Sequence, residues 1–201
     1  MLPMSSTDSF PRQKARTRGF QLGRPRSFAL AGTRVFFIRS SSGQDPAGNL
    51  WCVDVSDGSE RLLVSSPDLL ASGDLPAEER ARRERMREVT SGITAFSLDE
   101  SGSVAAFVVS GVPYVVEVDS GATTELPAPG PVVDPRMSPD GTHVAFVSGN
   151  GLYVVSLGDD TAVALCEPAH ADEAWGLADF IAAEELDRFR GHWWLAGGLL
   201  V

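Results

Sequence analysis

Short apolar runs separated by glycine-containing turns recur along most of the chain. Three stretches share one order, an apolar residue, a polar turn ending in glycine and then a β-branched or aromatic run, at residues 28–38, 96–108 and 137–147. A second apolar run and then a third, shorter one follow each of these stretches. Apolar runs of this kind bounded by turn residues are typical of β-strands. The pattern therefore predicts three units of several strands each.

The turns inside these units set the size of the repeat. In Ser138-Pro139-Asp140-Gly141, proline favours the first half of a turn and glycine accepts the positive φ of the second half. The corresponding Gly102 lies 39 residues before Gly141. A period near 40 residues with several strands per unit is typical of β-propeller blades. We expect a mainly β fold, a partial propeller with about three to four blades of a larger one.

The first unit is longer than the others because of a charged insertion near residues 66–92. Residues 74–90 are rich in Ala, Glu, Arg and Met, with Pro76 and two glutamates early and arginines late, which favours a helix. From Pro76 onward, Met86 and Val89 are the large apolar side chains of this segment, so the helix is predicted to project into solvent or a wet cavity. A solvated charged helix is the simpler interpretation.

Charge is unevenly distributed, within a net charge of −10. Residues 1–26 carry six Lys or Arg and one acid, whereas residues 101–201 carry three Arg and fourteen Asp or Glu. We expect a flexible basic segment at 1–26 and an incomplete propeller domain, with the helical insertion, at 27–201. An acidic half disfavours nucleic acid as a partner and favours a cation, although acidic surfaces also serve solubility.

A second helix is predicted over residues 173–190. On a helical wheel with Leu177 at 0° and 100° per residue, Glu184 falls at about 340°, inside the apolar arc, and Arg188 at about 20°. Glu185 falls on the flank of this arc. A desolvated carboxylate needs a partner or a role. Either Glu184 and Arg188 form a structural ion pair, or the two adjacent glutamates are kept to receive a cation.

Sequence motifs for catalysis or metal binding do not accompany the glutamates. The sequence has no G-x-S-x-G, no P-loop, no G-x-G-x-x-G and no H-E-x-x-H. Its Cys, His and Asp residues lack metal-ligand spacing, so we expect no cofactor and no metal. It has neither a signal-peptide run nor a membrane span, and its two cysteines have no disulfide spacing. These features predict a cytoplasmic protein without a membrane partner.

The segment around the two glutamates resembles that of a known peptidase family. Residues 175–194 read WGLADFIAAEELDRFRGHWW. They resemble the glutamate motif of the dipeptidyl peptidase IV family of serine peptidases, G-[VL]-A-x-F-[VI]-x-Q-E-E-x-[DN]-R-x-x-G-x-W-W, and depart from it at Ala183. Residues 83–93, RERMREVTSGI, are similar to an arginine-rich run of the bacterial and cytoplasmic members. The resemblance extends over roughly residues 20–194.

The resemblance implies an eight-bladed propeller that caps an α/β-hydrolase domain. By motif position, Glu184 and Glu185 would bind the free α-amino group of a peptide substrate, and Arg87, or alternatively Arg85, would hold the substrate backbone. A peptide ammonium carries one positive charge and three N–H donors. Two carboxylates can accept charge-assisted hydrogen bonds from these donors. The expected partners are peptides with a free N-terminus and the hydrolase domain of full-length relatives.

The chain departs from the family because it ends before the catalytic domain. The family's Ser, Asp and His lie hundreds of residues further on, so the chain is expected to be inactive alone. It would be a fragment, a truncated gene product or a degenerate relative. The expected function is the substrate-recognition part of a dipeptidyl-aminopeptidase-type serine peptidase. A non-catalytic propeller module that binds proteins, or a non-functional remnant, are the alternatives.

Overall fold

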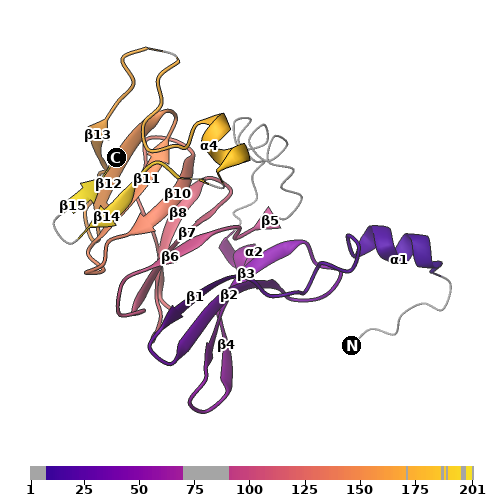
Figure 1. Ribbon diagram of the computed structural model, residues 1–201. Helices are drawn as coiled ribbons and strands as arrows, with labels where there is room; N and C mark the ends of the chain where they lie inside the picture. The colour runs from indigo at the N-terminus through magenta and orange to yellow at the C-terminus, as the bar shows by residue number, and fades with distance from the viewer. Residues whose placement is uncertain are drawn as a thin grey trace.

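Antiparallel β-sheets make up most of the molecule, as Figure 1 shows. The computed structural model describes residues 8–69, 91–170, 172–186, 188, 190–195 and 198–200, without the side chains at 180, 184 and 200. The insertion predicted to be helical at 74–90 lies outside these residues. The mainly β prediction is confirmed.

Each of the three predicted units forms one sheet. The first contains, in spatial order, β1 (Arg26–Ala31), β2 (Arg34–Ser40), β3 (Ala47–Asp54) and β4 (Ser59–Val64), with β5 (Ser91–Gly92) parallel to β3. The second contains β6 (Phe96–Leu98), β7 (Val104–Val109), β8 (Val112–Glu117) and β9 (Thr123–Glu125). The third contains β10 (Val132–Met137), β11 (His143–Ser148), β12 (Gly151–Ser156) and β13 (Val163–Cys166).

A meander of four antiparallel strands is the unit from which propeller blades are built. The sheets therefore correspond to three blades, numbered here in chain order. A further pair of strands, β14 (Trp193–Leu195) and β15 (Gly198–Leu200), forms a separate two-stranded sheet. This count agrees with the predicted three to four blades of a partial propeller.

The turn that gave the repeat its period has the geometry expected from its residues. Gly141 has φ +72° and donates its N–H to the Ser138 carbonyl at 3.0 Å. The Asp140 carboxylate accepts from the Ser138 hydroxyl at 2.6 Å and the Thr142 hydroxyl at 2.7 Å. These hydrogen bonds, from Ser138 first and then Thr142, lower the pKa of Asp140 to about 2. The turn is thus fixed by its own side chains before β11 begins.

Blade two lies between the other two blades and buries both of its faces. Successive residues of a strand point to opposite faces. On β7, Phe107 packs with the fully buried Phe36 and Ile38 of blade one. The neighbouring Ala106 packs with Phe146 of blade three. The core is therefore a stack of sheets with apolar side chains between them.

The basic N-terminal segment contains α1 (Phe10–Arg16), and a short α2 (Ser66–Leu69) follows β4. The ring centroids of Phe10 and Phe20 lie 5.9 Å apart, and the Gly23 N–H donates to the Ser40 hydroxyl at 2.9 Å. A domain boundary at residue 26 stays a prediction.

In the part of the chain that the structure covers, no helix is long and apolar enough to span a bilayer.

Candidate functional site

The two glutamates end a helix that is much shorter than the predicted one. α4 spans Phe180–Glu185, not residues 173–190. It begins after Asp179, whose side chain accepts a hydrogen bond from the Ala182 backbone N–H at 2.8 Å. Leu177 precedes this cap and is not helical. The wheel phased on Leu177 was therefore wrong, because the chain enters the helix only at the cap.

α4 has little buried surface to hold it in place. Among its described side chains Ala182 is 4% exposed, whereas Ile181 is 63% exposed and Glu185 is also exposed. Leu186, just after the helix, is 72% exposed. A six-residue helix is not stable alone in water, because the unfavourable free energy of nucleation exceeds the stabilisation from so few hydrogen bonds. The chain on either side must therefore determine where α4 lies.

Arg188 lies close to the cap at the start of α4. Its guanidinium is 3.7 Å from the Asp179 carboxylate, and its backbone N–H donates to the Ala182 carbonyl at 3.0 Å. The predicted partner, Glu184, has a side chain outside the description, so that ion pair stays a prediction. The partner that the structure gives Arg188 is Asp179.

The loop that carries α4 closes at a narrow neck, defined here as Gly176, Gly191 and His192; residues 177–190 between them are the glutamate loop. The Gly191 N–H donates to the Gly176 carbonyl at 3.0 Å, and Nδ1 of His192 lies 3.0 Å from the same oxygen. A Cβ built on Gly191 would lie 2.5 Å from the Leu177 carbonyl oxygen. The two chain segments of the neck approach so closely that a side chain at 191 cannot fit without movement.

The neck packs on the face of blade three that points away from blade two. Gly176 has φ +76°, and a Cβ there would lie 2.9 Å from Val147 and 3.0 Å from Leu152. Both of these side chains are fully buried. Just before the neck, the backbone N–H of Trp175 donates to the Asn150 carbonyl at 2.9 Å. The base of the glutamate loop is thus part of the core of blade three.

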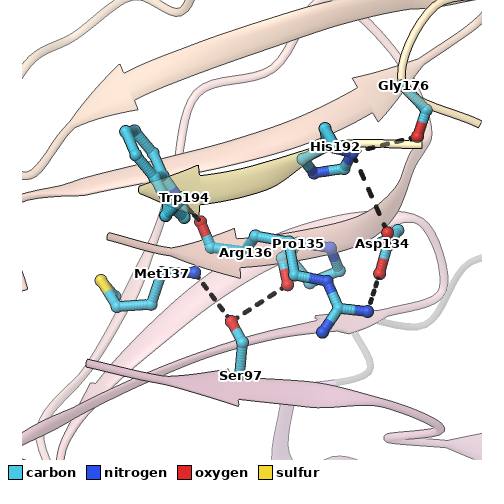
Figure 2. Close-up of polar contacts among 8 residues, drawn as sticks. All are labelled: Ser97, Asp134, Pro135, Arg136, Met137, Gly176, His192 and Trp194. Atoms are coloured by element: carbon cyan, nitrogen blue, oxygen red, sulfur yellow. Dashed lines mark hydrogen bonds and ion pairs between the residues drawn. The ribbon is translucent and has the colours of Figure 1, made fainter. Parts of the chain in front are cut away.

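His192 lies beside a charged cluster on β10, as Figure 2 shows. Its side chain is fully buried, and its Nδ1 is 4.0 Å from the Asp134 carboxylate, which pairs with Arg136. Asp134 has φ +49° at a β-bulge, where the register of β10 on β11 shifts. The Arg136 carbonyl accepts a hydrogen bond from the Trp194 indole N–H at 2.8 Å. The bulge thus directs a carboxylate toward the neck.

The cluster gathers several charges around one carboxylate. Burial, and then repulsion from Arg136, lower the pKa of the Arg190 guanidinium, while attraction to Asp134 opposes this shift. Oδ2 of Asp134, Nε of Arg136 and Nε2 of His192 are buried without a hydrogen-bond partner among the described residues. Asp134 therefore attracts two guanidinium groups and faces an imidazole.

Blade two supports the bulge from the other side. The Ser97 hydroxyl on β6 donates to the Pro135 carbonyl at 3.0 Å and accepts from the Met137 N–H at 2.8 Å. Sequence reasoning did not identify Asp134 or Arg136 as site residues. The available signal was Pro135, because proline within a predicted strand marks a bulge or an edge.

The predicted substrate residues are only partly covered by the structure. Glu184 and Glu185 are adjacent on α4, as the motif requires. Arg87 and its alternative Arg85 lie outside the described residues. Within the described ranges no group of three or more His, Cys, Asp or Glu side chains could hold a metal ion. The site that can be built is therefore an acidic pair on an anchored loop.

A family model matches the chain from the middle of blade two through the neck and the strands after it. The model of the dipeptidyl peptidase IV (DPP IV) N-terminal region covers residues 107–199, which include Glu184, Glu185 and His192. This part of the chain resembles a DPP IV N-terminal region. The DPP IV match thus contains the whole glutamate loop.

Two relatives that match the chain are dipeptidyl peptidases by name. The chain is 27% identical over 189 residues to dipeptidyl peptidase 8 of Mus musculus and of Homo sapiens, an alignment that covers 80% of this chain and 21% of each relative. It therefore spans about a fifth of the length of these relatives.

Among solved structures, one from a study of two prolyl endopeptidases matches with a TM-score of 0.54 at 16% identity. The alignment covers 79% of this chain and 25% of the chain in that structure. The tricorn protease has a TM-score of 0.50 at 15% identity, covering 77% and 14% respectively. At such identities these two likenesses concern the fold alone.

Proposed function

We propose that the chain is the substrate-recognition part of a dipeptidyl-aminopeptidase-type serine peptidase, in which Glu184 and Glu185 bind the free α-amino group of a peptide. An α/β-hydrolase domain would supply the catalytic residues, and Arg87 would contact the peptide backbone. A cytoplasmic location is part of the same proposal. The observation that carries it is the adjacent acidic pair on α4, inside the matched DPP IV region.

The position of the pair on α4 favours a cationic ligand. Both glutamates occupy the last two residues of the helix. Carboxylates at a helix C-terminus are repelled by the negative end of the helix dipole, although the effect is small in so short a helix. Glu185 is exposed, and its carboxylate has no ion pair with any residue in the described ranges. An ammonium would relieve this repulsion and donate hydrogen bonds to the free lone pairs of the carboxylates.

The experiment compares two forms of one peptide. The chain would be titrated with Ala-Pro-Ala and with N-acetyl-Ala-Pro-Ala, and binding followed by NMR on the backbone amides of α4. We expect the free-amine peptide to bind at least about tenfold more tightly, because a charge-assisted hydrogen bond contributes about 1.5–3 kcal/mol. Equal affinity for the two peptides would refute the proposal.

Charge-neutralising variants test the glutamates themselves. Glu184→Gln and Glu185→Gln should each weaken binding of the free-amine peptide by about tenfold or more, since each removes a charged acceptor of similar shape. Glu100→Gln is the matched control, because Glu100 is exposed in a turn of blade two. The proposal fails if all three variants bind the peptide as the parent chain does.

A protein-binding module without catalysis is the second candidate. It is favoured by the apolar side chains that β1 exposes, Phe28 at 65% and Leu30 at 78%. Phe28→Ser and Leu30→Ser would then abolish capture of a partner protein, while Glu184→Gln would not. The opposite pattern, with binding sensitive to the glutamate alone, contradicts this candidate.

A further inference from the structure

The glutamate loop has a fixed base and an exposed tip, and the base contains a buried histidine. α4 has one buried side chain, Ala182, among those described, so its own packing cannot hold the glutamates in place. At the base, Gly191 and His192 both contact the Gly176 carbonyl at 3.0 Å. These contacts join the two ends of the loop, 16 residues apart, at one oxygen.

We infer that His192 is a positioning residue, which holds the glutamate loop against blade three through the Gly176 carbonyl and the Asp134 carboxylate. This inference rests on the proposed function, because the loop is what presents Glu184 and Glu185. His192 does not touch the substrate. It acts by fixing where the loop leaves the sheet.

The proton on His192 follows from its neighbours. Nδ1 faces two oxygen atoms, the Gly176 carbonyl at 3.0 Å and the Asp134 carboxylate at 4.0 Å. A carbonyl oxygen only accepts, so Nδ1 must carry the proton and donate it to Gly176. The Nε2 atom is buried without a hydrogen-bond partner in the described part of the chain. Nδ1 is therefore the atom that anchors the loop.

The charged cluster keeps the histidine at this oxygen. Asp134 projects from the β10 bulge toward His192 and is itself held by Arg136. The Arg136 carbonyl holds the Trp194 indole two residues beyond the histidine. The groups that face His192 are thus anchored on blade three, so movement of the neck would break several contacts at once. This explains why a loop with an exposed tip can have one defined position.

Two amide substitutions separate the role of Nδ1 from that of a buried polar side chain. The side-chain NH2 of His192→Asn can reach the place of Nδ1, whereas the longer side chain of His192→Gln places its NH2 nearer Nε2. We expect His192→Gln to speed amide hydrogen exchange at Ala182, Ala183 and Gly191 by about tenfold, and His192→Asn to leave it close to the parent rate. His170→Gln, in an exposed turn, is the control.

The amides of β11 and β12 supply the internal reference for the same experiment. Faster exchange that is confined to the glutamate loop supports positioning. A rise of the same size in β11 and β12 overturns it, because His192 would then stabilise the whole blade. Parent-like exchange in both His192 variants also overturns it.

Peptide affinity provides a second readout that a purely structural role would not move. His192→Gln should weaken binding of Ala-Pro-Ala by about tenfold at a temperature where the variant is fully folded, and His192→Asn should restore it. If the parent chain fails to distinguish the free-amine from the acetylated peptide, the proposed function fails. The exchange data then still decide whether His192 positions the loop.

Discussion

The neck and the tip of the glutamate loop differ in almost every property that determines rigidity. His192 at the neck is fully buried, and Gly191 is packed against backbone atoms. At the tip, Ile181 is 63% exposed and Glu185 lies in solvent. The neck consists of closely packed residues, whereas the tip carries the acidic pair and has few packed side chains. An exposed acidic tip is thus joined to a buried base that is only a few residues away in the chain.

The largest effect is expected from filling the space between the two chain segments of the neck. In Gly191→Ala the new Cβ would lie 2.5 Å from the Leu177 carbonyl oxygen and 2.8 Å from the Gly176 carbonyl carbon. Backbone atoms cannot rotate away, so the free energy of unfolding should fall by about 2 kcal/mol. Chemical denaturation of the purified chain would measure this loss.

A second glycine gives the matched control for that substitution. In Gly43→Ala the nearest atom to the new Cβ, the Leu22 carbonyl oxygen, lies at an ordinary 3.7 Å. Its free energy of unfolding should stay within about 0.5 kcal/mol of the parent. If the two variants lose the same stability, the neck is not the closely packed element described here.

A medium effect is expected at the cap of α4. Asp179→Ala removes the acceptor of the Ala182 N–H and should destabilise the helix locally by about 1 kcal/mol. Hydrogen exchange at Ala182 and Ala183 would report this change. Asp179→Ser keeps an acceptor while removing the charge near Arg188, so it should exchange like the parent. If the amides of Asp179→Ser exchange as fast as those of Asp179→Ala, then the ion pair of Asp179 with Arg188, and not the cap, holds the helix.

The smallest effect is expected from Arg188. Its guanidinium is 3.7 Å from Asp179, and the two side chains are 48% and 69% exposed. Exposed pairs contribute about 0.2–1 kcal/mol and are screened by salt. Arg188→Gln should therefore change exchange of the α4 amides by less than about threefold, and the difference should shrink in 0.5 M salt. A larger change in exchange that persists at high salt would show that the Asp179–Arg188 ion pair contributes more than an exposed pair does.

The strands and blades were predictable because their signals are local. Alternation, the period of about 40 residues and the Ser138-Pro139-Asp140-Gly141 turn all lie within one unit. The adjacent glutamates were recognised from a motif of the same kind. The extent of α4 was not predictable, because the wheel included residues before Asp179 whose hydrogen bonds lie elsewhere, with blade three for Trp175 and with Gly191 for Gly176.

The charged cluster at the neck could not be read from the sequence because its contacts are distant in the chain. His192 lies near Asp134, and Trp194 donates to the Arg136 carbonyl 58 residues earlier. A helical wheel or a motif compares only residues that are close in sequence. Pro135 gave a hint of the bulge, but no hint of what the bulge faces.

A crystal structure of the chain with Ala-Pro-Ala bound tests the central claim most directly. We expect the peptide ammonium at hydrogen-bond distance, about 2.7–3.2 Å, from the carboxylates of Glu184 and Glu185. We also expect the Nδ1 atom of His192 to keep its contact with the Gly176 carbonyl. A peptide bound elsewhere, or one whose ammonium points away from both glutamates, would show that the acidic pair does not bind the amine.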